Sequence, residues 1–361
     1  MPPRWRLEKR AAPSFTMRMG APALAAGAML ATGFAIFAML GKAPLDALAV
    51  FFIDPLTTRY GWGELLLKST PLALCALGLA LGFRANVWNI GAEGQLTVGA
   101  LCGGGAALFC SAHLGVLAVP VILLAGTAGG AAWAAIPALL RTRFNTSEIL
   151  VSLMLVYIAQ LLLMSLLHGA WRDPEGFNYP QSRAFEDRLV LSPLLDGQRA
   201  TAAFPLMLGL AGASWVFSGR MFAGYRMRVA GQAPAAAAYA GFSQHRSVWI
   251  AMLVGGSAAG LAGVCEVLGP IGRLQEEISP GYGFAAIIVA FVGRLHPLGI
   301  VLAALLMSLL YLGGESVQLA LKLPAAVTGV FQGLLLFYLL AADLFVEFRL
   351  RRVPANPVSA A

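Results

Sequence analysis

The chain has 361 residues, of which 59% are hydrophobic and 12% are charged, and its mean hydropathy is +0.76. Soluble domains carry about 25% charged residues, so this composition excludes an ordinary water-soluble domain. Each membrane-spanning helix needs about 20 apolar residues, and an allowance of roughly 35 residues per span and loop predicts about ten spans. The composition therefore predicts an all-α polytopic integral membrane protein.

The net charge of +8 comes from 25 Lys and Arg against 17 Asp and Glu. Basic proteins often bind nucleic acid, but this sequence has no Lys- and Arg-rich stripe interleaved with aromatic residues. We therefore expect no nucleic-acid partner. We interpret the basic residues as cytoplasmic anchors of the membrane spans, which sit among membrane lipid.

The first segment of the chain, 1–19, is basic and is predicted to be a cytoplasmic tail. The apolar run that follows, at 20–40, is longer than a signal-peptide core and lacks a small-x-small cleavage site, so it predicts a retained transmembrane helix. A transmembrane domain is predicted over 20–348, with a cytoplasmic tail at 349–361. Nine further spans are predicted at 65–83, 87–110, 114–140, 147–168, 202–219, 247–269, 282–293, 297–313 and 325–347.

Ten spans place both termini on the same side of the membrane. If that side is the cytoplasm, sixteen Lys and Arg lie in cytoplasmic segments and nine lie in segments on the opposite side. The positive-inside rule therefore predicts cytoplasmic termini. A shift by one span would place one of the basic termini outside.

A polar segment, Asn-Val-Trp-Asn-Ile-Gly-Ala-Glu-Gly-Gln at 86–95, opens the third apolar run. An acidic group costs about 2.5–3.5 kcal/mol at the centre of a bilayer, so Glu93 must face protein, water or a partner. Two interpretations stay open: a helix cap with interhelical hydrogen bonds, and a polar patch on a translocation path. The residues that we predict to line or support such a path are Asn86, Trp88, Asn89, Glu93 and Gln95.

Two long loops separate the later spans. The loop at 171–201 is polar and is predicted to lie outside the cytoplasm, and the loop at 220–246 is predicted to be cytoplasmic. In the second loop, Pro234 begins an Ala-rich stretch and Gly241 ends it, which is typical of a short helix. A helix of two turns is marginal alone in water, so we expect it to be stabilised by a partner.

The 86–95 segment resembles the signature of the permease subunits of bacterial ATP-binding-cassette (ABC) importers for simple sugars, nucleosides and branched-chain amino acids. In that family it usually runs Phe-Asn-Ile-Gly-x-Glu-Gly-Gln. Three more segments match in the family's order: Phe-Asn-Thr-Ser-Glu-Ile at 144–149, the Ala-rich helix at 231–241, and the block from Gly-Tyr-Gly-Phe to Pro-Leu-Gly-Ile at 281–300. The resemblance covers roughly 65–345 and is nearest to nucleoside permeases linked to basic-membrane-protein-type binding lipoproteins.

This resemblance implies a permease domain that forms the path for a small polar solute, most nearly a nucleoside, in the bacterial inner (plasma) membrane. A simple sugar such as ribose, or branched-chain amino acids, are the alternatives. It implies three partners: an ATPase subunit that holds ATP and Mg²⁺, a second permease subunit in a homodimer or heterodimer, and a periplasmic or lipoprotein solute-binding protein. It implies no cofactor on this chain.

The resemblance also assigns the loop helix to ATPase coupling. The coupling residues it implies are Gln232, Pro234, Ala235, Ala238, Tyr239, Ala240 and Gly241. The family usually has Glu-Asn before this proline, where this chain has Gln232 and Ala233, so a charged contact is absent. Ala285 and Ala286 also stand where the family often has polar or acidic residues, which leaves the substrate class open.

Other functional classes lack their motifs in this sequence. There is no P-loop, so we expect ATP hydrolysis on a separate subunit. No metal-ligand cluster and no nucleophile elbow occur, so we expect neither a metal site nor catalytic residues. An ion-coupled secondary carrier stays an alternative, and it would depend on Glu93, Glu148 or Glu266 as intramembrane acids.

Overall fold

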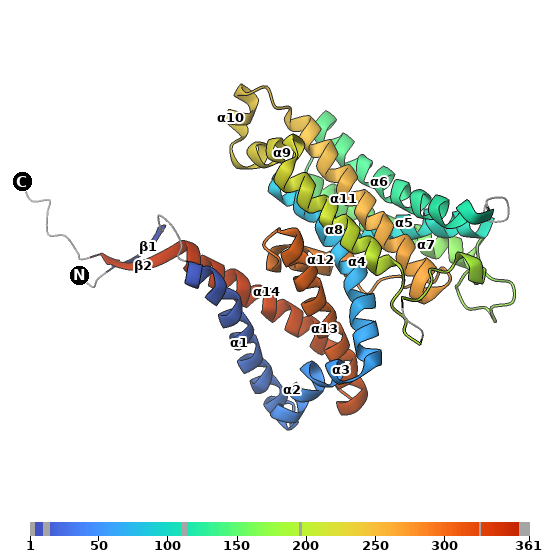
Figure 1. The fold of residues 1–361 in the computed structure, drawn as a ribbon, viewed down its shortest axis with the longest axis horizontal. Helices are drawn as coiled ribbons and strands as arrows, with labels where there is room; N and C mark the ends of the chain where they lie inside the picture. The colour runs from blue at the N-terminus through green and yellow to red at the C-terminus, as the bar shows by residue number, and fades with distance from the viewer. Residues whose placement is uncertain (1–3, 10–14, 110–114, 195–196, 325, 354–361) are drawn as a thin grey trace, which may run out of the picture. The chain divides into compact units, whose positions relative to one another are not determined.

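The computed structural model describes residues 4–9, 15–109, 115–194, 197–324 and 326–353 (Figure 1). The all-α prediction is confirmed, apart from one strand pair. The elements in chain order are β1 (Arg4–Lys9), α1 (Phe15–Met39), α2 (Pro44–Phe52), α3 (Asp54–Thr57), α4 (Arg59–Arg84), α5 (Ala92–Phe109), η2 (Gly115–Leu117), α6 (Ala118–Phe144), α7 (Glu148–His168), η3 (Asp187–Leu189), α8 (Ala203–Arg220), α9 (Phe222–Gln232), α10 (Pro234–Tyr239), α11 (Gln244–Glu266), η4 (Val267–Ile271), α12 (Tyr282–Val292), α13 (Pro297–Leu321), α14 (Ala326–Glu347) and β2 (Phe348–Val353).

Each of the ten predicted apolar runs contains a helix. Among the described residues, five helices are long and apolar enough to cross a membrane, and a sixth span results if α8 and α9, which bend by 69°, are one span. The five are α4, α6, α7, α11 extended through η4, and α13. Ten spans and cytoplasmic termini therefore stay predictions. Residues 110, 114 and 325, at the ends of three predicted runs, lie outside the described residues.

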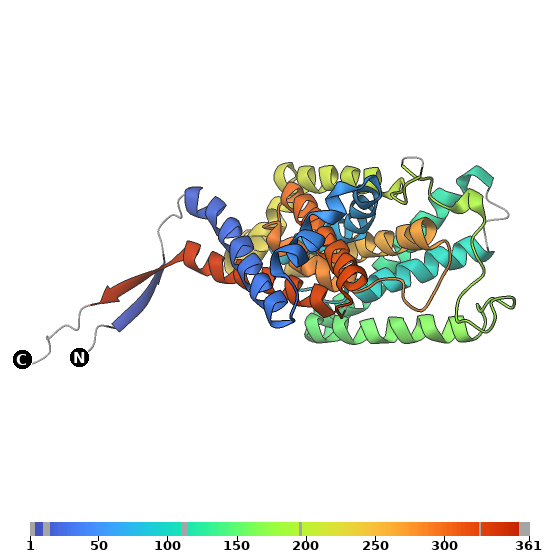
Figure 2. The ribbon, with the colours of Figure 1, turned by 90° about the horizontal axis from the view of Figure 1, so that it is seen from below.

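The chain divides into two compact units, one made of 1–57 with 310–361 and the other of 58–309. In the first unit, α1 packs along α14 (Figure 1, Figure 2). Phe331 of α14 stacks on Phe51 with ring centroids 4.5 Å apart and lies 5.7 Å from Phe37. These aromatic contacts join α1, α2 and α14.

The strand pair is a feature that the sequence analysis missed. β1 and β2 run antiparallel, with Leu7 opposite Leu350 (Figure 2). In β1, the apolar residues Trp5 and Leu7 alternate with arginines. This two-residue period is typical of a β-strand. Such a short run forms a strand only when it pairs, and its partner lies at the other end of the chain. Residues 1–3, 10–14 and 354–361 of the two predicted tails lie outside the described residues.

The second unit is built around α4 and α11. Within the most apolar window of α4, 89% of the residues are buried. α11 packs against α4, α5 and α6, and Figure 1 shows it among these helices. A Cβ atom on Gly99 would lie 2.3 Å from the Gly260 Cα, so α5 and α11 meet backbone to backbone.

The substitution Gly260→Ala is expected to destabilise this unit. Its Cβ would lie 2.4 Å from the Gly126 carbonyl oxygen, so the backbones of α6 and α11 must separate. We expect a loss of about 1–3 kcal/mol in unfolding free energy, measured by thermal unfolding of the purified chain in detergent. Gly209→Ala on α8 is the matched control, because its Cβ meets no atom within 4 Å. Equal thermal midpoints for Gly260→Ala and Gly209→Ala would contradict the close packing of α6 against α11.

Candidate functional site

The first part of the polar segment, residues 86–91, interrupts the helical chain between α4 and α5. The chain turns at Asn86, which has a φ of +55°, and then runs without helical structure until α5 begins. Its backbone is held by side chains of α7: Trp88 N–H donates to Glu148 Oε1 at 3.3 Å, and Ile90 N–H donates to Ser152 Oγ at 3.3 Å. Non-helical backbone inside a membrane protein needs such protein partners, because lipid supplies none.

Asn89 and Gln95 pair with each other inside this segment. Asn89 Nδ2 donates to Gln95 Oε1 at 2.8 Å, and Gln95 Nε2 donates to Asn89 Oδ1 at 2.9 Å. Asn89 Oδ1 also accepts from Gly91 N–H at 3.1 Å. Both side chains are buried. The reciprocal amide pair fixes the path of the chain as it enters α5.

Glu93 lies in the first turn of α5 and is buried. Its Oε2 accepts from Gly283 N–H at 2.6 Å, in the first turn of α12, and the Ser279 hydroxyl also bonds to this carboxylate. The N-terminal end of a helix carries a partial positive charge. The carboxylate therefore joins the N-terminal ends of two helices that lie far apart in the sequence.

Trp88 and Asn86 lie at the more accessible side of the segment. The Trp88 ring lies 5.0 Å from Phe83 and 5.9 Å from Phe291, and its Nε1 donates to Asn86 Oδ1 at 3.1 Å. Of the predicted path residues, Asn89, Glu93 and Gln95 are buried, Trp88 is half-buried and Asn86 is exposed. The structure thus joins Asn86 to Trp88 and Asn89 to Gln95 and holds Glu93 against α12, and the contact of these five residues with a solute stays a prediction.

A second group of charged residues includes Glu266, which the sequence analysis named, and Glu64 and Arg199, whose pairing it missed. Glu64 of α4 is buried, and its Oε1 lies 3.2 Å from Arg199 Nη1 in the 171–201 loop. Glu266 of α11 interacts electrostatically with both residues and with Lys68. Only the spacing of Glu64 and Lys68, four residues apart on one helix, was visible in the sequence. Lys68 and Arg199 therefore place positive charge near Glu266, whereas Glu64 places a like charge there.

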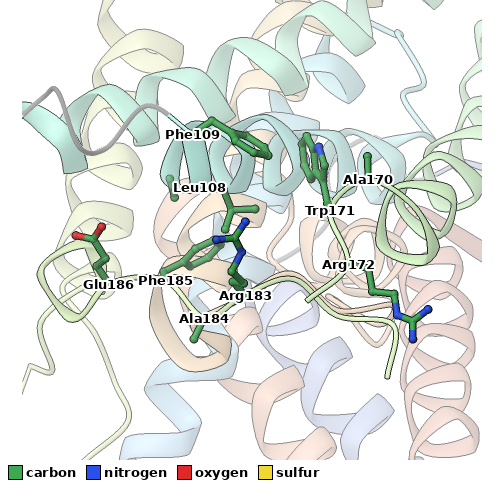
Figure 3. Close-up of a pocket in the computed structure, with 10 residues that line it drawn as sticks. Leu108, Phe109, Ala170, Trp171, Arg172, Arg183, Ala184, Phe185 and Glu186 are labelled. Atoms are coloured by element: carbon green, nitrogen blue, oxygen red, sulfur yellow. The ribbon is translucent and has the colours of Figure 1, made fainter. Parts of the chain in front are cut away.

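A cavity of about 210 Å³ lies where α5 ends against the 171–201 loop (Figure 3). The Trp171 ring stands 5.6 Å from Phe109, and Arg183, Phe185 and Glu186 also line the cavity. Its lining combines aromatic and charged side chains. It does not include the 86–95 segment, so the two features are separate places on the chain.

The predicted loop helix is confirmed as α10. Gly241 follows it with a φ of +76°, and Phe242 N–H bonds back to the Ala237 carbonyl at 2.8 Å, which closes the helix end. Ala237 is the buried residue of this helix, while Tyr239 is 98% exposed. The predicted coupling residues are all exposed: Gln232, Pro234, Ala235, Ala238, Tyr239, Ala240 and Gly241. An exposed helix of this length is a surface to which a partner can bind.

A sequence model described as the branched-chain amino acid transport system permease component matches residues 62–340. The chain belongs to this family. The match covers the polar segment, α10 and the α12 region in one continuous stretch. This membrane-embedded permease is therefore a transport component.

The permease is similar along most of its length to several proteins named as ABC transporter permeases. It is 36% identical to a glucose ABC transporter permease protein of Haloferax volcanii, over 94% of this chain and 92% of that protein. It is 29% identical to a guanosine ABC transporter permease protein of Bacillus subtilis, over 91% and 95% of the two chains. It is 27% identical to a nucleoside ABC transporter permease protein of Lactococcus lactis, over 91% and 92%. No solved structure matches the chain.

The variant Glu93→Ala should destabilise the permease more than Glu93→Gln. Alanine leaves the buried Gly283 N–H without its acceptor, at a cost of about 1–3 kcal/mol, whereas glutamine keeps an acceptor oxygen. Thermal unfolding of the purified variants measures the difference. Glu175→Ala, at an exposed loop position, should behave as the wild type. Equal losses for the alanine and glutamine variants would contradict the role of the hydrogen bond.

Proposed function

We propose that this permease forms the membrane path of an ABC importer for a nucleoside. The family match over 62–340 is the observation that supports the importer role. Similar proteins named guanosine and nucleoside permeases support the substrate class. The relative named a glucose permease supports glucose as the second candidate.

The local chemistry at 86–95 suits a neutral solute. The acid of this segment, Glu93, is engaged by the first turn of α12, and Asn89 is engaged by Gln95. A neutral nucleoside or sugar needs no charged side chain on the path to balance it. Weak contacts between the path and such a solute would let the solute leave the path. The half-buried Trp88 ring adds an aromatic surface on which a nucleoside base could stack.

The proposed assembly contains more than this chain. An ATPase that binds ATP and Mg²⁺ contacts α10, and a solute-binding protein delivers the solute on the other side of a bacterial inner membrane. Two Bacillus subtilis proteins similar to this chain are both named guanosine ABC transporter permeases. That pairing supports a homologous second permease subunit, with a homodimer as the alternative. Closure of the ATPases would move α10 as a rigid body and switch access to the path.

Uptake of labelled solutes tests the substrate. Cells that carry the complete complex should accumulate labelled guanosine, and excess unlabelled uridine or adenosine should compete. Ribose and leucine should not compete. Accumulation of glucose without guanosine would favour the second candidate and contradict the nucleoside assignment.

The substitution Tyr239→Ala tests the ATPase contact. This side chain is 98% exposed, so its removal should leave the thermal midpoint unchanged. If Tyr239 is a central contact of the ATPase interface, co-purification of the ATPase should fall at least about tenfold, since central interface tyrosines are often worth 2 kcal/mol or more. Tyr179→Ala, which is also exposed but lies in the 171–201 loop, is the matched control and should retain the ATPase. Full retention by both Tyr239→Ala and a variant lacking 232–241 would contradict the coupling role.

A further inference from the structure

A basic pocket of about 650 Å³ lies beside the last turn of α9. Its lining residues are Phe83, Arg84, Asn86, Arg228, Gly231, Gln232, Arg294 and Leu295. Three of these residues are arginines. Among the residues that the structure describes, no Asp or Glu lines the pocket. The charge predictions place all three arginines on the cytoplasmic side. We name this feature the arginine pocket.

The three arginines come from three separate parts of the fold. Arg84 ends α4, Arg228 lies on α9, and Arg294 lies in the turn between α12 and α13. Arg84 Nη2 donates to the Leu295 carbonyl at 2.6 Å, and Arg228 Nη2 donates to the Ser218 carbonyl at 2.9 Å. A guanidinium has several N–H donors, so a single bond of this kind leaves donors for a ligand.

The arrangement concentrates positive charge. The charge of Arg228 lies close enough to that of Arg84 to repel it. Holding like charges together is unfavourable unless an anion binds between them. Arg228 and Arg294 are exposed, so an anion can reach the pocket from solvent or from the membrane surface. Asn86 and Gln232 add neutral amide donors at its edge.

We infer that the arginine pocket binds a phosphate group, presented either by an anionic lipid headgroup or by a free phosphate ester. Guanidinium forks match phosphate oxygens bidentately. A free phosphate monoester carries close to two negative charges at neutral pH and offsets more of the arginine charge than a carboxylate does, whereas the phosphodiester of a lipid headgroup carries one.

The pocket lies where the loop helix meets the bundle. Gly231 is so close to α4 that a Cβ on it would lie 2.3 Å from the Arg84 carbonyl oxygen. Gln232 lines the pocket and ends α9, and α10 begins two residues later. A phosphate held by Arg84 and Arg228 therefore ties α9, and with it the start of α10, to the end of α4.

The first experiment titrates inorganic phosphate into the purified full chain in neutral detergent. Phosphate should raise the thermal midpoint by about 2 °C or more over chloride at matched ionic strength. Arg228→Gln should abolish this difference, and Arg228→Lys should keep part of it. Arg246→Gln removes the same charge from an exposed position outside the pocket and should respond as the wild type.

The second experiment separates the two sources of phosphate. The same variants are placed in nanodiscs of phosphatidylglycerol mixed with phosphatidylcholine, and the lipid retained on the protein is counted by native mass spectrometry. If a lipid is the ligand, the wild type retains more phosphatidylglycerol than Arg228→Gln, and added phosphate reduces the excess. If a free ester is the ligand, retention is equal and the phosphate response persists in the nanodiscs.

Two outcomes would overturn the inference. One is the absence of both a phosphate-specific response and a difference in lipid retention. The other is an unchanged phosphate response in Arg228→Gln combined with loss of ATPase co-purification, which would assign the pocket to an acidic side chain of the ATPase. Neither binding experiment uses a transported solute, so failure here would leave the proposed transport function standing.

Discussion

The Glu93 carboxylate is the interaction on which the geometry of the polar segment depends. It is buried in the first turn of α5 and accepts a hydrogen bond from Gly283 N–H in the first turn of α12. The partial positive charges of both helix ends stabilise the carboxylate there. Glycine is required at 283, because a Cβ would lie 2.3 Å from the Glu93 nitrogen. Charge and close approach therefore fix where both helices begin.

The non-helical segment before α5 is possible because α7 supplies its hydrogen-bond partners. Glu148 and Ser152 accept from its backbone, and Glu148 also pairs with Arg141 of α6. The glycine-mediated packing of α5 and α11 supports the segment from the other side. A broken chain held in this way keeps amide and aromatic side chains next to the start of α5 at little cost in unpaired backbone. The proposed path for a polar solute would need such an arrangement.

The central helix α4 links the two faces of its unit. Glu64 near one end pairs with Arg199 of the 171–201 loop, and Arg84 at the other end lines the arginine pocket. Because α9 rests on the end of α4, the chain just before α10 is in backbone contact with α4. The polar segment follows α4 directly, after Ala85. The end of α9 and the start of the polar segment therefore both adjoin the end of α4.

The sequence by itself determined the membrane class, the positions of ten helices, the start and end of α10 and the family resemblance. Each of these rests on local signals: apolar runs, a proline and a glycine at helix ends, and short motifs. It left open what Glu93 contacts, and it missed the Glu64–Arg199 pair, the convergence of Arg84, Arg228 and Arg294, and the pairing of β1 with β2. Only the tertiary structure decided these, because each contact joins residues that lie far apart in the chain, and no local pattern records such a partner. The hydrogen bond from Gly283 to Glu93 spans 190 positions.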